Sequence, residues 1–163
     1  MSSSQQTGIS KSEQLLLIAQ RLAEASGGFF LIQGPGQGNR LTNAYMDALN
    51  KLAATTFGVD HSQKHLCPGT GFCVDFYFPD EGTIVEIALS ARNPTSEYER
   101  DLFKAILAKE AGHNVARLIF VSRPGASRKL NEPGPKAIRS YVARIHLIDS
   151  VIEELVSDDS AAR

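Results

Sequence analysis

Two acidic residues stand in apolar stretches on either side of a short turn, where their types and spacing could do chemistry. Asp75 belongs to the segment 71–78 (GFCVDFYF) and Glu86 to the segment 83–90 (TIVEIALS), with the sequence PDEG between them. A carboxylate in apolar surroundings destabilises the fold unless a proton, a basic partner or a cation compensates its charge. Paired carboxylates suit hard divalent cations such as Mg²⁺ or Mn²⁺, which prefer oxygen ligands. Such an ion can activate water and neutralise charge that grows on a phosphate.

Both segments are predicted strands of one hairpin, because they are rich in β-branched and aromatic residues and meet at a turn. Side chains alternate across a strand, so Cys73 and Asp75 share one face. If the turn has four residues, Phe78 pairs with Thr83, and counting back places Asp75 directly opposite Glu86. Like charges at opposed positions repel, which again calls for compensation. A different register, or a partly solvated face on which the acids ionise separately, is the alternative.

The rest of the chain alternates predicted helices and strands within one α/β or α+β domain over residues 1–163. The ends 1–9 and 157–163 are expected to be flexible. Apolar periodicity predicts four helices. The first covers residues 10–26 and opens with a capping box of Ser10 and Glu13, and the second starts at about Asn43 with Thr42 as its N-cap. The third covers residues 96–112 with Ser96 as its N-cap, and the fourth covers residues 135–155. Further strands are predicted at residues 29–33 and 115–123, residues 58–71 show no clear period, and residues 124–136 read as a turn-rich basic loop.

Composition narrows the functional classes. The chain has 163 residues, 42% of them hydrophobic, a formal net charge of −1 and two cysteines. No apolar run approaches the ~20 residues of a membrane span, and no secretory signal is visible at the N-terminus, so we expect a cytoplasmic protein without a membrane partner. The near-neutral charge argues against a dedicated polyanion binder but leaves room for a local basic patch.

A strand with Asp75, a turn, a strand with Glu86 and then a helix reading YERDLFKAIL resemble the nuclease core of the PD-(D/E)xK superfamily. The likeness is to restriction endonucleases of the BglII and BamHI kind and covers residues 71–122, about a third of the chain. It implies a restriction-endonuclease-like core, with a central mixed β-sheet flanked by helices, that hydrolyses DNA phosphodiester bonds with Mg²⁺ (or Mn²⁺). Carried over, the metal ligands would be Asp75, Glu86 and the backbone carbonyl of Ile87.

The sequence departs from this family pattern at Ala88, where the family usually has lysine. A methyl group can neither orient a water nor stabilise a developing charge. In some families a basic residue of the following helix takes this role, which nominates Arg100 or Lys104 as a catalytic residue. Helical periodicity places Lys104 nearly opposite the apolar stripe and Arg100 closer to its edge. The competing hypothesis is a degenerate nuclease-fold protein that acts as a DNA-binding or protein-assembly module. A basic side chain seated between the two acids would argue against the metal.

The C-terminal half is locally basic and could hold a phosphate backbone. If the loop 123–139 lies beside the acids, its basic side chains would bring DNA to the metal, whereas a solvated surface is the alternative. The candidate nucleic-acid contacts are Arg123, Arg128, Lys129, Lys136 and Arg139. Cleavage of both DNA strands would call for a homodimer, because one site per chain does not easily reach both strands.

Two further patterns carry weaker expectations. The segment 33–39 (QGPGQGN) lacks both the lysine of a phosphate-binding loop and the third glycine of a dinucleotide site, so we expect a surface turn. A possible zinc set matches none of the common spacings, and we expect loop histidines and small thiols in its place. That set is His61, His65, Cys67 and Cys73.

Overall fold

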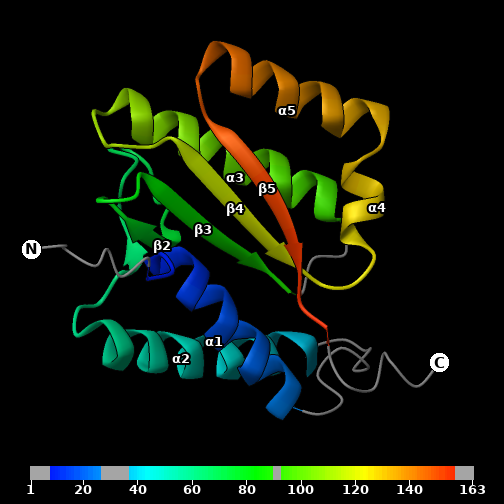
Figure 1. The fold of residues 1–163 in the computed structure, drawn as a ribbon. Coiled ribbons are helices and arrows are strands. Elements are labelled where there is room, and N and C mark those ends of the chain that lie inside the picture. The colour runs from blue at the N-terminus through cyan, green and yellow to red at the C-terminus, as the bar shows by residue number, and fades with distance from the viewer. Residues whose placement is uncertain (1–7, 27–36, 90–92, 157–163) are drawn as a thin grey trace, which may run out of the picture.

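A computed structural model of the chain describes residues 8–26, 37–89 and 93–156 and shows an α/β fold built on a five-stranded mixed sheet (Figure 1). The strand order follows the chain. The first three strands pair antiparallel, and the third, fourth and fifth pair parallel. The strands are β1 (Ser62–Lys64), β2 (Val74–Phe78), β3 (Thr83–Ala88), β4 (Arg117–Ser122) and β5 (Asp149–Glu154). The helices are α1 (Lys11–Ala25), α2 (Gln37–Phe57), α3 (Pro94–Glu110), α4 (Ala126–Leu130) and α5 (Pro133–Ile145).

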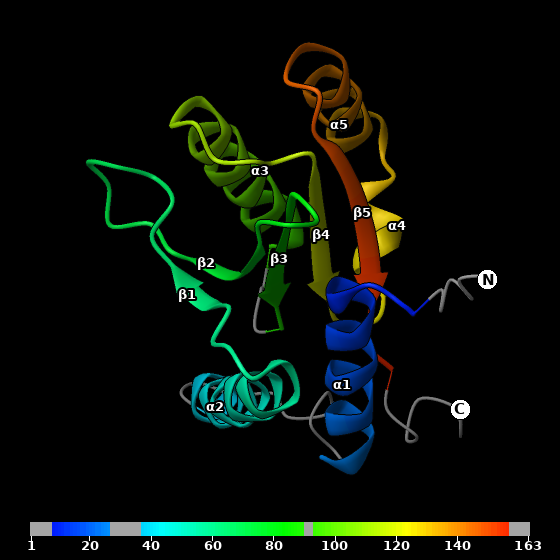
Figure 2. The same ribbon diagram turned by 60° about the vertical axis from the view of Figure 1, so that its left-hand side comes forward.

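Helices cover both faces of the sheet and give the molecule three layers (Figure 2). On one face α1 and α2 pack against a core that includes Phe76 and Val85. On the other face α3 and α5 pack against Ile84 and Phe120, and the parallel strands are thereby buried from both sides, as such strands require. The expected mixed sheet flanked by helices is confirmed.

The β2–β3 hairpin has the predicted register. Phe78 pairs with Thr83 and Phe76 with Val85, and the same register places Asp75 opposite Glu86. Gly82 closes the turn with a φ of +60°, and its carbonyl accepts hydrogen bonds from the amides of Ala116 and Arg117, where β4 begins. The hairpin is therefore tied directly to the parallel part of the sheet.

Helix starts were predicted with mixed success. The capping box of Ser10 and Glu13 at the start of α1 is confirmed, with both reciprocal hydrogen bonds present. α2 begins at Gln37, so Thr42 lies inside the helix and is not its N-cap. α3 is capped by Asn93, whose side chain accepts from the amide of Ser96. Pro94 supplies the first helical residue and needs no amide partner there, so the helix starts before the predicted cap.

The predicted last helix over 135–155 is wrong in its second half. The helix α5 ends at Ile145, the chain turns through Leu147 at a φ of +55°, and Asp149–Glu154 form the edge strand β5. The apolar residues of this stretch fit both periods over so short a length. Parallel pairing with β4 satisfies the backbone and decides for a strand.

Short elements occupy two segments that were predicted to be irregular. β1 lies within residues 58–71 and pairs with β2, and α4 interrupts the basic loop 124–136. No helix among the described residues combines the length and the apolar character needed to cross a bilayer. The predicted strand 29–33, the first part of the segment 33–39 and the ends 1–7 and 157–163 lie outside the described residues.

Candidate functional site

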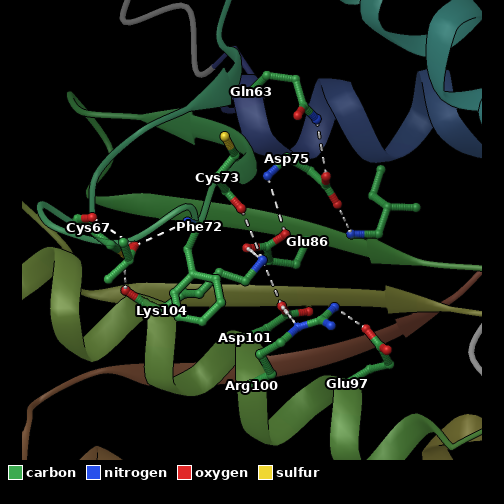
Figure 3. Close-up of polar contacts among 12 residues, drawn as sticks. Gln63, Cys67, Phe72, Cys73, Asp75, Glu86, Glu97, Arg100, Asp101 and Lys104 are labelled. Carbon is green, nitrogen blue, oxygen red and sulfur yellow. Dashed lines mark hydrogen bonds and ion pairs between the residues drawn. The ribbon is translucent and has the colours of Figure 1, made fainter.

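A polar pocket opens beside the two strand acids, on the sheet face that α3 covers. Its volume is about 280 Å³. Its lining comes from β2, β3 and the Glu97–Lys104 part of α3, and Figure 3 shows the polar side chains of these elements directed toward one another. The lining residues are Asp75, Glu86, Ile87, Ala88, Glu97, Arg100, Asp101 and Lys104.

Asp75 and Glu86 hold each other in place through the backbone of the neighbouring strand. Glu86 Oε2 accepts from the amide of Asp75 at 3.2 Å, and Asp75 Oδ2 accepts from the amide of Ile87 at 2.7 Å. Gln63 of β1 donates to the other oxygen of Asp75 at 3.3 Å (Figure 3). The two carboxylates therefore take fixed orientations on one face of the sheet, and each keeps lone pairs for another ligand.

Lys104 places its ammonium group against Glu86, which corrects the predicted direction of this side chain. Nζ lies 2.8 Å from Glu86 Oε1 and donates at 3.0 Å to the backbone carbonyl of Cys73. Lys104 is buried, whereas its apolar neighbour Phe103 is 53% exposed. The buried face of α3 includes a charged residue that pairs with a strand acid, so the apolar periodicity of the sequence wrongly predicted the side of this helix on which Lys104 lies. The lysine contacts Glu86 and has no described contact with Asp75, so it does not bridge the two strand acids.

Asp101 is the acid that the sequence pattern missed. It is buried one helical turn before Lys104, and its Oδ1 lies 2.9 Å from Nζ as an ion pair without hydrogen-bond alignment. The spacing of three residues between an acid and a base on one helix was the available signal. Arg100 is half exposed at the rim of the pocket, where it pairs with Glu97 and lies 4.0 Å from Asp101.

Burial and mutual repulsion favour protons on these acids. Desolvation, followed by the charges of Asp101 and Asp75, raises the pKa of Glu86 well above its ordinary value. Desolvation raises the pKa of Asp101 to about 6, although Lys104 opposes the shift. For Lys104 desolvation lowers the pKa, but the two facing carboxylates outweigh it and leave the pKa raised. The carboxylates therefore keep the Lys104 ammonium protonated, and they still favour the binding of one further positive charge, a proton or a cation.

The donor set of the pocket fits a hard divalent cation. Four carboxylates face two basic side chains, a formal balance of −2 when all are ionised. Oxygen donors and a polar lining are the environment that Mg²⁺ or Mn²⁺ prefers, whereas Asp101 Oδ1 already lies 2.9 Å from the Lys104 ammonium. No three His, Cys, Asp or Glu residues in the described ranges surround a common point. Asp75, Glu86 and Ile87, the metal ligands that the sequence predicts, all line this pocket.

The predicted phosphate contacts lie elsewhere, since none of the five basic residues lines the pocket. Arg123 follows β4, while Arg128 and Lys129 are exposed on α4, which packs against α3. Lys136 is exposed on α5, and Arg139 of the same helix donates to Asn131.

The possible zinc set is brought together only in part. Cys73 Sγ lies 3.1 Å from His65 Nε2, but Cys67 donates to the backbone of α3. The ring of His61 packs between Phe57 and Phe78. Two of the four side chains are therefore engaged in packing and hydrogen bonding away from the other two.

Comparison with protein-family models, with curated proteins and with solved structures gave no match. The assignment of function therefore rests on the pocket. Its distinguishing feature is the Lys104 ammonium group of α3 placed against Glu86 of β3, in a pocket that Asp75 and Ala88 also line.

Proposed function

We propose that the chain is a metal-dependent nuclease that hydrolyses phosphodiester bonds of DNA on a restriction-endonuclease-like, PD-(D/E)xK-type core. The observation that carries the proposal is the contact of the two acids across β2–β3, where Glu86 accepts from the amide of Asp75, with the Lys104 ammonium 2.8 Å from Glu86. Two fixed carboxylates and one ammonium in a single pocket are a minimal set for phosphoryl-transfer chemistry.

Each side chain has a separate role in this proposal. Asp75 and Glu86, with the carbonyl of Ile87, bind Mg²⁺ or Mn²⁺, which when bound supplies a Lewis acid for the phosphate. Lys104 supplies the positive charge that Ala88 lacks and faces the charge that grows on the phosphate. Asp101 keeps that ammonium charged and in position. Arg100 is at the rim, where it can meet an incoming phosphate once it leaves Glu97.

Substrate binding in this proposal uses the basic surface beyond α3. Arg123, Arg128 and Lys129 would contact phosphates of the bound strand. Such contacts weaken steeply with added salt, because each neutralised phosphate releases counterions. Double-strand cleavage would use two chains, one site for each strand.

A second candidate function is a degenerate nuclease-fold module that binds DNA or a protein without cutting. The specific observation in its favour is that the Lys104 ammonium already has three partners, the carboxylates of Glu86 and Asp101 and the carbonyl of Cys73. A closed ion-pair network of this kind stabilises a fold without needing a metal.

Thermal unfolding with added metal, combined with cleavage of supercoiled DNA, tests the proposal. We expect Mg²⁺ or Mn²⁺ at 100 times its Kd to stabilise the chain by about 2.7 kcal/mol and to support cleavage. Asp75→Asn and Glu86→Gln should abolish both effects. Lys104→Gln should abolish cleavage while it retains a metal-induced shift.

The matched control is Glu110→Gln, which removes an exposed carboxylate from the last turn of α3. This variant should behave as the parent in both assays. Absence of a metal-induced shift in the parent chain, together with absence of cleavage, would decide for the binding module. A shift that survives in Asp75→Asn would place the metal elsewhere.

A further inference from the structure

The outer face of α5 carries an apolar ridge, and every charged residue of this helix is basic. Ile138, Tyr141 and Ile145 follow at spacings of three and four residues, so they lie on one side of the helix. They are 37%, 52% and 49% exposed, although each is large and apolar. The helix contains Lys136, Arg139 and Arg144 and no acidic residue.

A groove of opposite character lies on the other side of the sheet edge. It has a volume of about 390 Å³ and runs between α1 and the end of β5. Its apolar lining residues are Ile9, Leu16, Leu17 and Leu155, and its charged lining residues are Glu13, Glu153 and Glu154. All charged side chains of the groove are therefore acidic, as all those of α5 are basic.

We propose that the α5 ridge of one chain docks into the α1–β5 groove of a second copy of this chain. The apolar side chains of the ridge would fill the apolar floor, and Arg144, which lies beside Tyr141 on the ridge, would face Glu153 of the groove. Complementary charge of this kind selects the partner and the register, and the buried apolar residues supply affinity.

The arrangement of the two surfaces allows a closed pair. α5 and α1 lie on opposite faces of the sheet, and both adjoin β5, which is an edge strand of the sheet order (Figure 2). A two-fold axis along this edge exchanges the faces of the sheet, so that each ridge meets the groove of its partner. The contact would then form twice and close the dimer.

A nucleic-acid partner fits the ridge less well than a protein groove does. Phosphates would engage Lys136 and Arg139, but they offer nothing to the exposed Ile138 and Ile145. The cation–π contact with Tyr141 also places the Arg144 guanidinium on the ridge, beside the apolar residues.

Sedimentation velocity of the full chain over a concentration series tests the proposal. We expect a dimer that dissociates on dilution, with affinity that falls as salt is added. Tyr141→Glu on the ridge and Leu17→Arg in the groove should each weaken the dimer by about tenfold or more, because each places a like charge in the contact. Leu52→Glu is the matched control, since Leu52 is 46% exposed on α2, and it should leave the dimer unchanged.

Charge reversal makes the pairing specific. Arg144→Glu and Glu153→Arg should each weaken the dimer, and the double variant should recover the affinity of the parent. A parent chain that stays monomeric up to about 100 µM, or a dimer that no ridge or groove variant weakens, would overturn the proposal. So would ridge variants that keep the dimer and lose DNA binding. The metal-induced shift of Tyr141→Glu should equal that of the parent, which separates this test from that of the pocket.

Discussion

Lys104 and Glu86 form a buried ion pair at 2.8 Å between a helix and the strand hairpin. The pair fixes α3 over the strand acids, with the ammonium group supplied by the helix and the carboxylate by β3. Both side chains are almost fully removed from water, and Asp101 adds a second carboxylate to the same ammonium. The consequences of this arrangement can be measured.

Removal of the lysine should cost much of the stability of the fold. We expect Lys104→Met to reduce the free energy of unfolding by about 3 kcal/mol at pH 7, because two buried carboxylates lose their counter-charge. The loss should shrink at pH 5, where the acids take up protons. Urea unfolding measures it, and Lys51→Met, at an exposed position of α2, should stay within about 0.5 kcal/mol of the parent. An equally mild effect of both substitutions would contradict a buried ion pair.

Asp101 should make stability depend on pH between about 4 and 6. Its pKa in the folded chain is raised to about 6, above the ~3.9 of an unfolded aspartate, so the folded state binds the proton more tightly. The stability that the bound proton contributes is full below pH 4 and is lost as pH rises through 6. We expect a loss on the order of 2 kcal/mol.

Comparison with Asp101→Asn isolates this contribution, since hydrogen bonds lower the pKa of Glu13, Asp60 and Asp80, which therefore titrate with opposite sign. The difference in unfolding free energy between the parent and Asp101→Asn should change across this window and be flat above it. A constant difference from pH 4 to pH 7 would mean that Asp101 is ionised throughout.

The proposed metal should bind more tightly as pH rises. Because burial raises the pKa of both Glu86 and Asp101, protons and the cation compete for the same negative charge. We expect the Mg²⁺-induced rise in melting temperature to be larger at pH 8 than at pH 6, and calorimetry in buffers of different ionisation enthalpy should register released protons. Equal shifts at the two pH values would show that the metal displaces no proton.

The hairpin turn should tolerate no side chain at Gly82. Its φ of +60° disfavours any other residue, and an added Cβ would lie 3.2 Å from the side chain of Asn114. We expect Gly82→Ala to cost about 2–3 kcal/mol in the free energy of unfolding. Gly58→Ala provides the control, because Gly58 also has a positive φ but open space around it, and it should cost only about 1 kcal/mol. If the two substitutions lowered the free energy of unfolding equally, the contact with Asn114 would not contribute to the effect at Gly82.

Local patterns in the sequence predicted the features that depend on near neighbours. The capping box of α1 and the register of β2 on β3 follow from residues within a few positions of each other, and both are confirmed. The register alone placed Asp75 opposite Glu86. These features need no knowledge of the rest of the chain.

Features that depend on distant partners were missed or misplaced. β5 is a strand because β4 offers it a parallel edge, and its own apolar spacing was equally compatible with a helix. Lys104 is directed inward because Glu86 and the carbonyl of Cys73 lie on the strands beneath it. A hydrophobic stripe cannot indicate a face that is buried through charge pairing.

The link between β5 and α4 sets an order on the assembly of the chain. Glu154 accepts hydrogen bonds from the amides of Gly125 and Ser127, which open α4 and have no side-chain cap of their own. During synthesis these hydrogen bonds cannot form until Glu154, almost thirty residues downstream, has left the ribosome. The turn after β4 should therefore mature late, in the same step that adds the final strand to the sheet.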